Sequence, residues 1–217
     1  MLDDLALPRT DAAQVRPLVG KGSEHLIRAV LDRASASRQS VAKTEKDGRS
    51  QSVFDSAWER YQSHYLAVNG QNAHVFPGVI EGLEAMRASD LRLACLTNKP
   101  TAFAVSLLAS KGLAGYFSHV FGGDAFERKK PDPLPLLKTC EALGTSPSRT
   151  LMVGDSSNDA AAARAAGCPV VLVTYGYNHG EPVREVDADG FLDSLSELST
   201  VFGFGVARPT RNGSTAT

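Results

Sequence analysis

The sequence lacks several features that would assign it to a specialised class of protein. It contains 23 lysine and arginine residues against 24 aspartate and glutamate residues, a formal net charge of −1, so no basic surface for nucleic acid is expected. No apolar run approaches the roughly 20 residues of a membrane-spanning helix. The first residues also show no secretory signal pattern. We therefore expect a cytoplasmic protein without nucleic-acid or membrane partners.

Cysteine is also scarce, with three residues: Cys95, Cys140 and Cys168. They are spread along the chain in mostly apolar surroundings, which fits a reducing compartment and predicts no catalytic thiol. Of the 217 residues 42% are hydrophobic, enough for one core domain and a smaller inserted domain.

Two kinds of hydrophobic pattern divide the chain. Residues 1–70 have the spacing of amphipathic helices, whereas from Pro77 onward short apolar runs alternate with helical segments. This alternation predicts an α/β fold, a parallel sheet with helices on both faces. We expect a helical cap over residues 1–75, an α/β core over 76–203 and a disordered tail over 204–217. The predicted strands are 91–96, 116–121, 150–153 and 170–174.

The most informative stretch is Leu151–Asp159, an apolar run that ends in two carboxylates. Asp155 follows the predicted strand, and Asp159 begins an alanine-rich helix four residues later. Open α/β sheets bind ligands at the carboxyl ends of their strands. Carboxylates meeting there can hold Mg²⁺, which prefers oxygen ligands. The alternative is an ordinary turn in which Asp155 and Ser156 cap the helix.

Two further segments have a similar position at the start of a helix. Thr97 and Asn98 follow the strand 91–96, and Pro100 is placed to open the next helix. A hydroxyl, an amide and free backbone N–H groups at a helix start can bind an anion. Lys130 precedes Pro131, which favours an extended backbone and could direct its ammonium towards phosphate. Each segment alone is also compatible with a turn or a solvated surface.

In order, these motifs resemble motifs II, III and IV of the haloacid dehalogenase superfamily. Within it, the chain is similar to the bacterial phosphoglycolate phosphatases over residues 15–198. The segments 15–22 and 76–78 resemble the cap and the entry to the core of that family. The run Thr174–Gly180 is similar to one associated with phosphoglycolate phosphatases more than with their relatives.

The resemblance implies a Mg²⁺-dependent phosphatase of small phosphomonoesters, with 2-phosphoglycolate as the first candidate substrate and an aspartyl-phosphate intermediate. Another sugar-phosphate phosphatase or mutase, or an inactive remnant, are the alternatives. The protein is expected to be a monomer or a homodimer. The implied roles are metal binding by Asp155, catalysis by Lys130, Asp155 and Asp159, and phosphate or substrate binding by Thr97, Asn98, Lys130 and Gly22.

One element of the resemblance is missing. Motif I, an apolar strand followed by Asp-x-Asp-Gly-Thr, should precede the cap and supply the nucleophile, but the chain starts with Met1–Pro8. We therefore expect a truncated start, a sheet without its first strand, and negligible activity of residues 1–217. A similar pattern, Asp187–Ser194, would imply a circular permutation. It fits a short last strand, 190–192, and a helix over 195–202 better.

Overall fold

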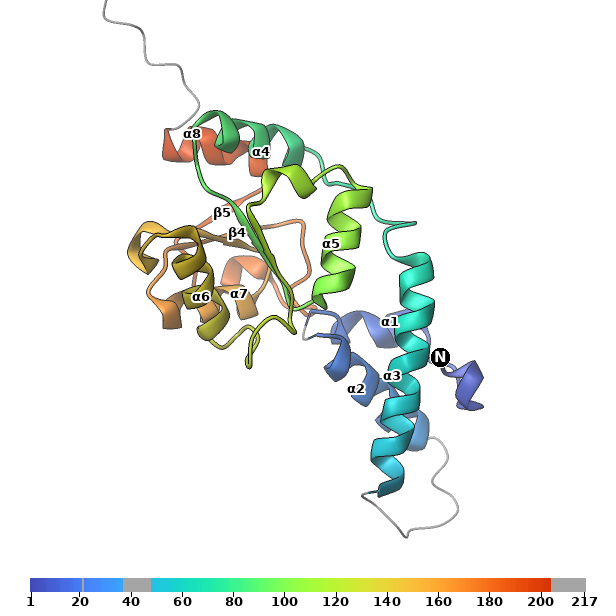
Figure 1. Ribbon diagram of the computed structural model, residues 1–217. Helices are drawn as coiled ribbons and strands as arrows, with labels where there is room; N and C mark the ends of the chain where they lie inside the picture. The colour runs from blue at the N-terminus through green and yellow to red at the C-terminus, as the bar shows by residue number, and fades with distance from the viewer. Residues whose placement is uncertain (21, 37–47, 204–217) are drawn as a thin grey trace, which may run out of the picture.

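The computed structural model describes residues 1–20, 22–36 and 48–203. The first part of the chain is helical and lies beside one end of the α/β part (Figure 1). The disordered tail predicted for residues 204–217 lies outside the described residues. The helical part contains η1 (Asp3–Leu5), α1 (Ala12–Val15), η2 (Arg16–Leu18), α2 (Ser23–Ala36) and α3 (Gly48–Val68).

The rest of the chain is an α/β unit with parallel strand pairing throughout the described sheets, which confirms the predicted fold class. The four strands predicted at 91–96, 116–121, 150–153 and 170–174 are each shorter in the structure, and Tyr116 lies in the 3₁₀ turn η3 (Ala114–Tyr116) rather than in a strand. The strands are β1 (Ala94–Leu96) paired with β2 (His119–Phe121), and β3 (Met152–Gly154), β4 (Val170–Val173) and β5 (Gly190–Leu192) paired in that order.

Helices cover both faces of the sheet that contains β4. Val170 and Leu172 point into the cluster under α6 and α7, whereas Val171 and Val173 pack with residues of α4 and α8. This alternation follows from the two-residue period of a strand, and burial on both sides explains why the whole strand is apolar. The helices are α4 (Val79–Ala88), α5 (Thr101–Ser110), α6 (Leu134–Leu143), α7 (Ser157–Ala166) and α8 (Leu198–Phe202), with short 3₁₀ turns η4 (Pro147–Arg149), η5 (Val183–Glu185) and η6 (Leu195–Glu197).

The helical part has its own small core, formed by Ile27, Leu31, Phe54 and Ala57 of α2 and α3. A row of aromatic rings continues from this core along α3 towards the α/β part. Its last member, Tyr65, lies 4.9 Å from the ring of Phe103 in α5. The aromatic row therefore connects the core of the cap with the core of the α/β part. The domain limits predicted at residues 75 and 76 stay predictions.

β1 and β3 belong to different sheets. Among the described strands, β1 pairs with β2 alone and β3 with β4 alone, so each has one edge without a strand partner. β5 lies at the other edge of the three-stranded sheet. Its bounds and the helical turn after it agree with the short last strand and helix predicted for residues 190–202.

One expectation about the cysteines was wrong. Cys140 in α6 and Cys168 before β4 are both buried, and their sulfur atoms lie 3.9 Å apart. They were expected to be unclustered because 27 residues separate them in the sequence. α6 and the start of β4 meet in the same core cluster, which brings the two thiols together.

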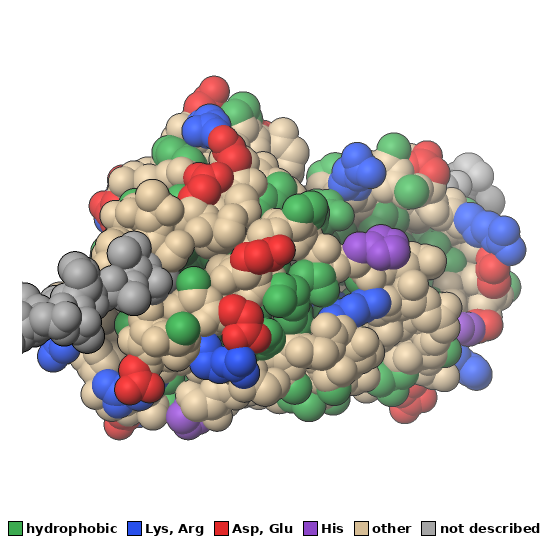
Figure 2. Space-filling model, turned by 90° about the horizontal axis from the view of Figure 1, so that it is seen from above, with side chains coloured by type: hydrophobic (Ala, Val, Ile, Leu, Met, Phe, Trp, Pro, Cys, Tyr) green, Lys and Arg blue, Asp and Glu red, His purple; other side chains and the backbone are tan. Residues whose placement is uncertain are grey.

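The surface agrees with the balanced composition. Figure 2 shows acidic and basic side chains interspersed on one face of the molecule, without a large patch of one sign. Within the described ranges, no helix has the length and hydropathy required to cross a membrane.

Candidate active site

The predicted site residues come together at the carboxyl ends of the parallel strands. Thr97 follows β1, Asp155 follows β3, and Lys130 lies in the segment between β2 and α6. They line a cavity of about 460 Å³ between the α/β part and the helices of the cap. Strand ends gather there because parallel strands present the same end to one edge. All six predicted residues line it: Gly22, Thr97, Asn98, Lys130, Asp155 and Asp159.

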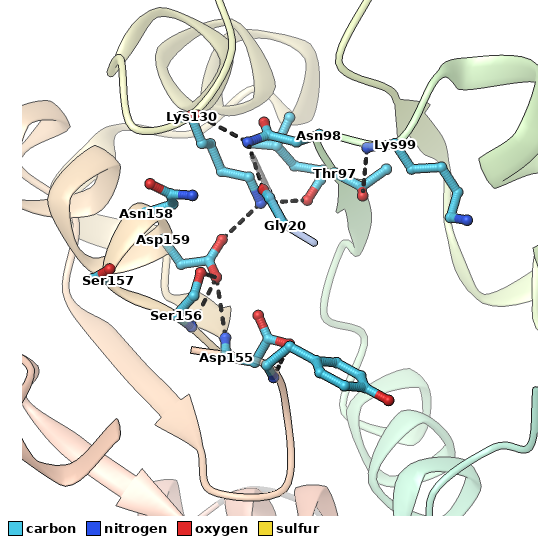
Figure 3. A network of polar contacts seen from close by, with 12 residues as sticks. Gly20, Thr97, Asn98, Lys99, Lys130, Asp155, Ser156, Ser157, Asn158 and Asp159 are labelled. Atoms are coloured by element: carbon cyan, nitrogen blue, oxygen red, sulfur yellow. Dashed lines mark hydrogen bonds and ion pairs between the residues drawn. The ribbon is translucent and has the colours of Figure 1, made fainter. Parts of the chain in front are cut away.

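A buried ion pair lies at the base of this cavity (Figure 3). The ammonium of Lys130 donates to Asp159 Oδ1 at 2.7 Å and to the carbonyl oxygen of Leu96 at 2.8 Å. Lys130 is only 8% exposed. An ammonium has three protons to donate, so these two contacts leave one for a ligand in the cavity. The arrangement holds a positive charge at a fixed point, where it can neutralise an anion.

Asp159 is held by several donors at once. Its Oδ2 accepts from the backbone N–H groups of Asp155 and Ser156, both at 3.1 Å, and from the Ser156 hydroxyl at 2.8 Å. Burial opposes its charged form, but the neighbouring Lys130 ammonium and these donors lower the pKa of Asp159 below its usual value. With both oxygens engaged, Asp159 positions Lys130 and has little capacity left for a metal ion.

Asp155 has a different environment. Its Oδ2 accepts from the backbone N–H of Tyr177 at 3.0 Å. Burial raises the pKa of Asp155, and the negative charge of Asp159 adds to the rise, whereas the Tyr177 N–H and Lys130 oppose it. A cation beside the carboxylate would offset this cost of burying its charge. Asp155 is therefore the carboxylate of this pair that fits a metal ligand.

The donor set for a metal is small. The described residues contain no cluster of three or more His, Cys, Asp or Glu side chains suited to a metal ion. Mg²⁺ commonly uses one or two carboxylates together with water and substrate oxygens. Asp155 matches that chemistry in kind, and the remaining oxygens would have to come from other groups.

The anion cradle predicted at Thr97 and Asn98 is partly occupied. Thr97 Oγ1 accepts from the Lys99 N–H at 3.1 Å, which leaves the hydroxyl proton free to donate. The first N–H of α5, on Thr101, is bound by the carboxylate of Asp124 at 2.8 Å. The Asn98 amide donates to the Lys130 carbonyl at 2.8 Å and to the Gly20 carbonyl at 3.3 Å. Thus the Asn98 side chain joins the site to the cap.

The cap side of the cavity contains residues that the sequence did not identify as site residues. Tyr61 and Tyr65 belong to the aromatic row of α3 and line the cavity. Lys99 contacts the Tyr65 hydroxyl and lies 4.4 Å from the centre of its ring. Gly22 adopts φ +93°, and a Cβ there would lie 3.1 Å from Lys129 Nζ. The helical period of the aromatic residues was visible in the sequence, but not which members would face the cavity.

The fold and this arrangement of residues identify the class of protein. The model of the haloacid dehalogenase-like hydrolase family matches residues 9–173, about three quarters of the chain. The chain belongs to this family. Its parallel sheets and its lysine–aspartate site at the carboxyl edge agree with that assignment.

Individual relatives are also similar over most of their length. The chain is 41% identical over 199 residues to a protein named phosphoglycolate phosphatase from Thiobacillus denitrificans, covering 92% of this chain and 83% of that one. It is 38% identical over 205 residues to the phosphoglycolate phosphatase of Salmonella typhi, covering 92% and 81%. The crystal structure of a predicted phosphoglycolate phosphatase from Haemophilus somnus superimposes with a TM-score of 0.82 at 31% identity, covering 93% and 86%.

Proposed function

We propose that this chain carries the phosphate- and metal-binding residues of a Mg²⁺-dependent phosphatase, and that 2-phosphoglycolate is its first candidate substrate. The observation on which the proposal depends is the buried Lys130–Asp159 pair, with one ammonium proton free at the base of the cavity. The names of relatives at about 40% identity support the same activity.

The main task of the protein in this reaction is to neutralise the negative charge of the substrate and the nucleophile. A phosphomonoester is a dianion, and an attacking carboxylate is repelled by it. Lys130 lies where it can contact both anions. The Thr97 hydroxyl would donate to a phosphate oxygen, because it accepts from the Lys99 N–H, which leaves its proton available. Asp159 keeps Lys130 in place.

Mg²⁺ bound at Asp155 would screen the phosphoryl group from the nucleophile. The Tyr177 N–H fixes one oxygen of Asp155, which orients the carboxylate for this role. Gly176 leaves the space that the Asp155 side chain occupies, because a Cβ at Gly176 would lie 2.1 Å from Asp155 Cβ.

The nucleophile is assigned to a motif I aspartate, which residues 1–217 do not contain. In this scheme its carboxylate attacks phosphorus, the ester P–O bond breaks, and the leaving oxygen takes a proton from the second aspartate of motif I, which acts as the general acid. Water then hydrolyses the acyl phosphate. The strand that leads to this aspartate would pair with the free edges of β1 and β3, since Thr97 and Asp155, which follow these strands, line the same cavity.

A second anionic group on the substrate is supported by the cap-side wall. Lys99, near Tyr65, places another positive charge in the same cavity as Lys130. A carboxylate beside a phosphate, as in 2-phosphoglycolate, would find a counter-charge there.

The test uses a motif I-extended form, in which the family's apolar strand and Asp-x-Asp-Gly-Thr loop precede residue 1. We expect it to hydrolyse 2-phosphoglycolate with Mg²⁺, faster than it hydrolyses a panel of sugar phosphates. Activity that persists in excess chelator would remove the metal from the proposal. A preference for a sugar phosphate would replace the substrate but keep the reaction class.

A further inference from the structure

The run Thr174–Gly180 after β4 has no role in the chemistry above apart from its Tyr177 N–H and the space that Gly176 leaves for Asp155. It connects β4 to the turn η5 and passes the mouth of the cavity. Its contacts reach both the core and the cap.

Two neighbouring residues fasten this run to the core. The Tyr177 N–H donates to Asp155, and the buried side chain of Asn178 accepts from the Ser157 N–H at 2.8 Å. Ser157 begins α7, so the amide caps the helix that carries Asp159. The position of the next residue, His179, is therefore determined by the same groups that build the site.

The His179 ring lies between the core and the cap. Its Nδ1 lies 3.0 Å from the carbonyl oxygen of Val19, and its Nε2 lies 3.1 Å from the amide nitrogen of Asn158. A carbonyl oxygen can only accept and an amide N–H can only donate. The neutral ring with its proton on Nδ1 therefore satisfies both contacts.

The neighbouring cap residue, Gly20, fits against the same ring. Gly20 has φ +102°, and a Cβ there would lie 2.7 Å from His179 Cε1. Its carbonyl oxygen accepts from the Asn98 amide, which also holds the Lys130 carbonyl. Two consecutive carbonyls of the cap are thus bound by two core side chains that are 81 residues apart in sequence.

We propose that His179 is a positioning residue that latches the Val19–Gly20 segment of the cap over the cavity. Its Nδ1–H group holds the cap. Its contact with Asn158, and the anchored residues Tyr177 and Asn178 before it, fix the position of the ring relative to the site. The inference rests on the proposed function only for the identity of the anion that the closed cap encloses.

Three substitutions separate the two contacts of the ring. In His179→Asn the amide N–H occupies the place of Nδ1 and can still donate to Val19, and asparagine accepts the left-handed φ of +54° found here. In His179→Gln the longer side chain places its amide near Nε2 and loses the Val19 contact. His179→Ala loses both. His119→Gln, on β2 and away from the cavity, is the matched control.

The first measurement is hydrogen–deuterium exchange on the 217-residue chain. We expect faster exchange in a peptide spanning residues 16–26 for His179→Gln and His179→Ala, with His179→Asn and His119→Gln close to wild type. Exchange in α6 should not change in any variant. Equal exchange in all variants, or a rise spread over the whole core, would overturn the latch.

The second measurement is binding of inorganic phosphate to the same proteins. Loss of one hydrogen bond that closes the site should weaken binding about 5- to 10-fold in His179→Gln, and His179→Asn should restore it. If the wild-type chain binds no phosphate, the proposed function is weakened while the exchange data still decide the latch. If phosphate binds all variants equally, His179 does not position the cap.

Discussion

At the scale of single residues, the site is organised around one buried positive charge. Lys130 and Asp159 are each less than a tenth exposed and bind each other at 2.7 Å. Burying two charges is costly unless their hydrogen bonds are satisfied. Here the Leu96 carbonyl, two backbone N–H groups and the Ser156 hydroxyl satisfy most of them, and one ammonium proton stays available to a ligand.

Substitution of Lys130 tests this arrangement. In the motif I-extended form, Lys130→Ala should reduce turnover about 10²- to 10³-fold, the usual effect of removing a preorganised charge. Steady-state kinetics with saturating substrate measure it.

Lys129→Ala is the control for that substitution. Lys129 lies beside Gly22 of the cap and is not part of the buried pair, so its loss should have little effect on turnover. Equal losses in the two variants would refute the assignment of Lys130.

The charge of Asp159 also predicts a dependence of stability on pH. Because its folded-state pKa is lowered, its contribution is present above the usual aspartate pKa and is lost as pH falls through the lowered value. Asp159→Asn should lower the free energy of unfolding at pH 7 by about 3–5 kcal/mol, since it leaves Lys130 unpaired. Chemical denaturation at several pH values measures the difference.

That difference should begin to shrink as the pH falls below about 4, the usual aspartate pKa, because the unfolded chain then binds a proton. It should vanish only below the lowered pKa of Asp159 in the folded protein. Asp32→Asn, at an exposed position of α2, is the control and should change stability little at any pH. A difference between wild type and Asp159→Asn that stays constant down to the lowest pH would show that the ion pair is not its origin.

At the scale of elements, functional groups follow the ends of several strands, such as Thr97 after β1 and Asp155 after β3. β5, which lies in the segment that resembles motif I, contributes none. β5 is a paired edge strand, and the acids around it are bound to other side chains. Arg164 of α7 binds Asp187 and Asp189, and Asp193 accepts from Thr174 and Arg184. These contacts give the Asp187–Ser194 pattern a role in joining α7 and β4 to β5.

Asp187→Asn therefore tests the permuted alternative. We expect turnover of the motif I-extended form to stay within about twofold of wild type. Stability should change little, because the pair with Arg164 is at the surface. A loss of turnover by orders of magnitude would identify Asp187 as the nucleophile.

At the scale of the whole molecule, the cavity is lined by residues that follow core strands, by residues of the cap and by Tyr177 of the Thr174–Gly180 run. The described part of the chain places Asp155 and Asp159 in it, and Asp159 is fully engaged. One available carboxylate offers too few oxygens to compete with water around Mg²⁺.

Residues 1–217 alone should therefore bind Mg²⁺ weakly and show negligible turnover. The assay is hydrolysis of 2-phosphoglycolate at saturating Mg²⁺, with isothermal titration for the metal. Turnover in the ordinary enzymatic range of about 1–10³ s⁻¹ would mean that another carboxylate of this chain is the nucleophile.

The sequence by itself determined the α/β class, the approximate positions of the strands along the chain and the positions of Thr97, Lys130, Asp155 and Asp159 near helix starts. These features follow from local periodicity and from turn residues, which act over a few positions. The shorter strands and the turn at Tyr116 show the limit of that reasoning. Where a strand begins and ends depends on its hydrogen bonds to the neighbouring strand.

Only the tertiary structure decided which groups the polar side chains meet. His179 contacts Val19 across 160 residues, Lys130 donates to Leu96 at the end of another strand, and Cys140 lies against Cys168. The Asn98 amide binds two carbonyls instead of remaining free. Such contacts arise from the packing of whole elements, so no local pattern encodes them, and a buried polar group takes whichever partner that packing supplies.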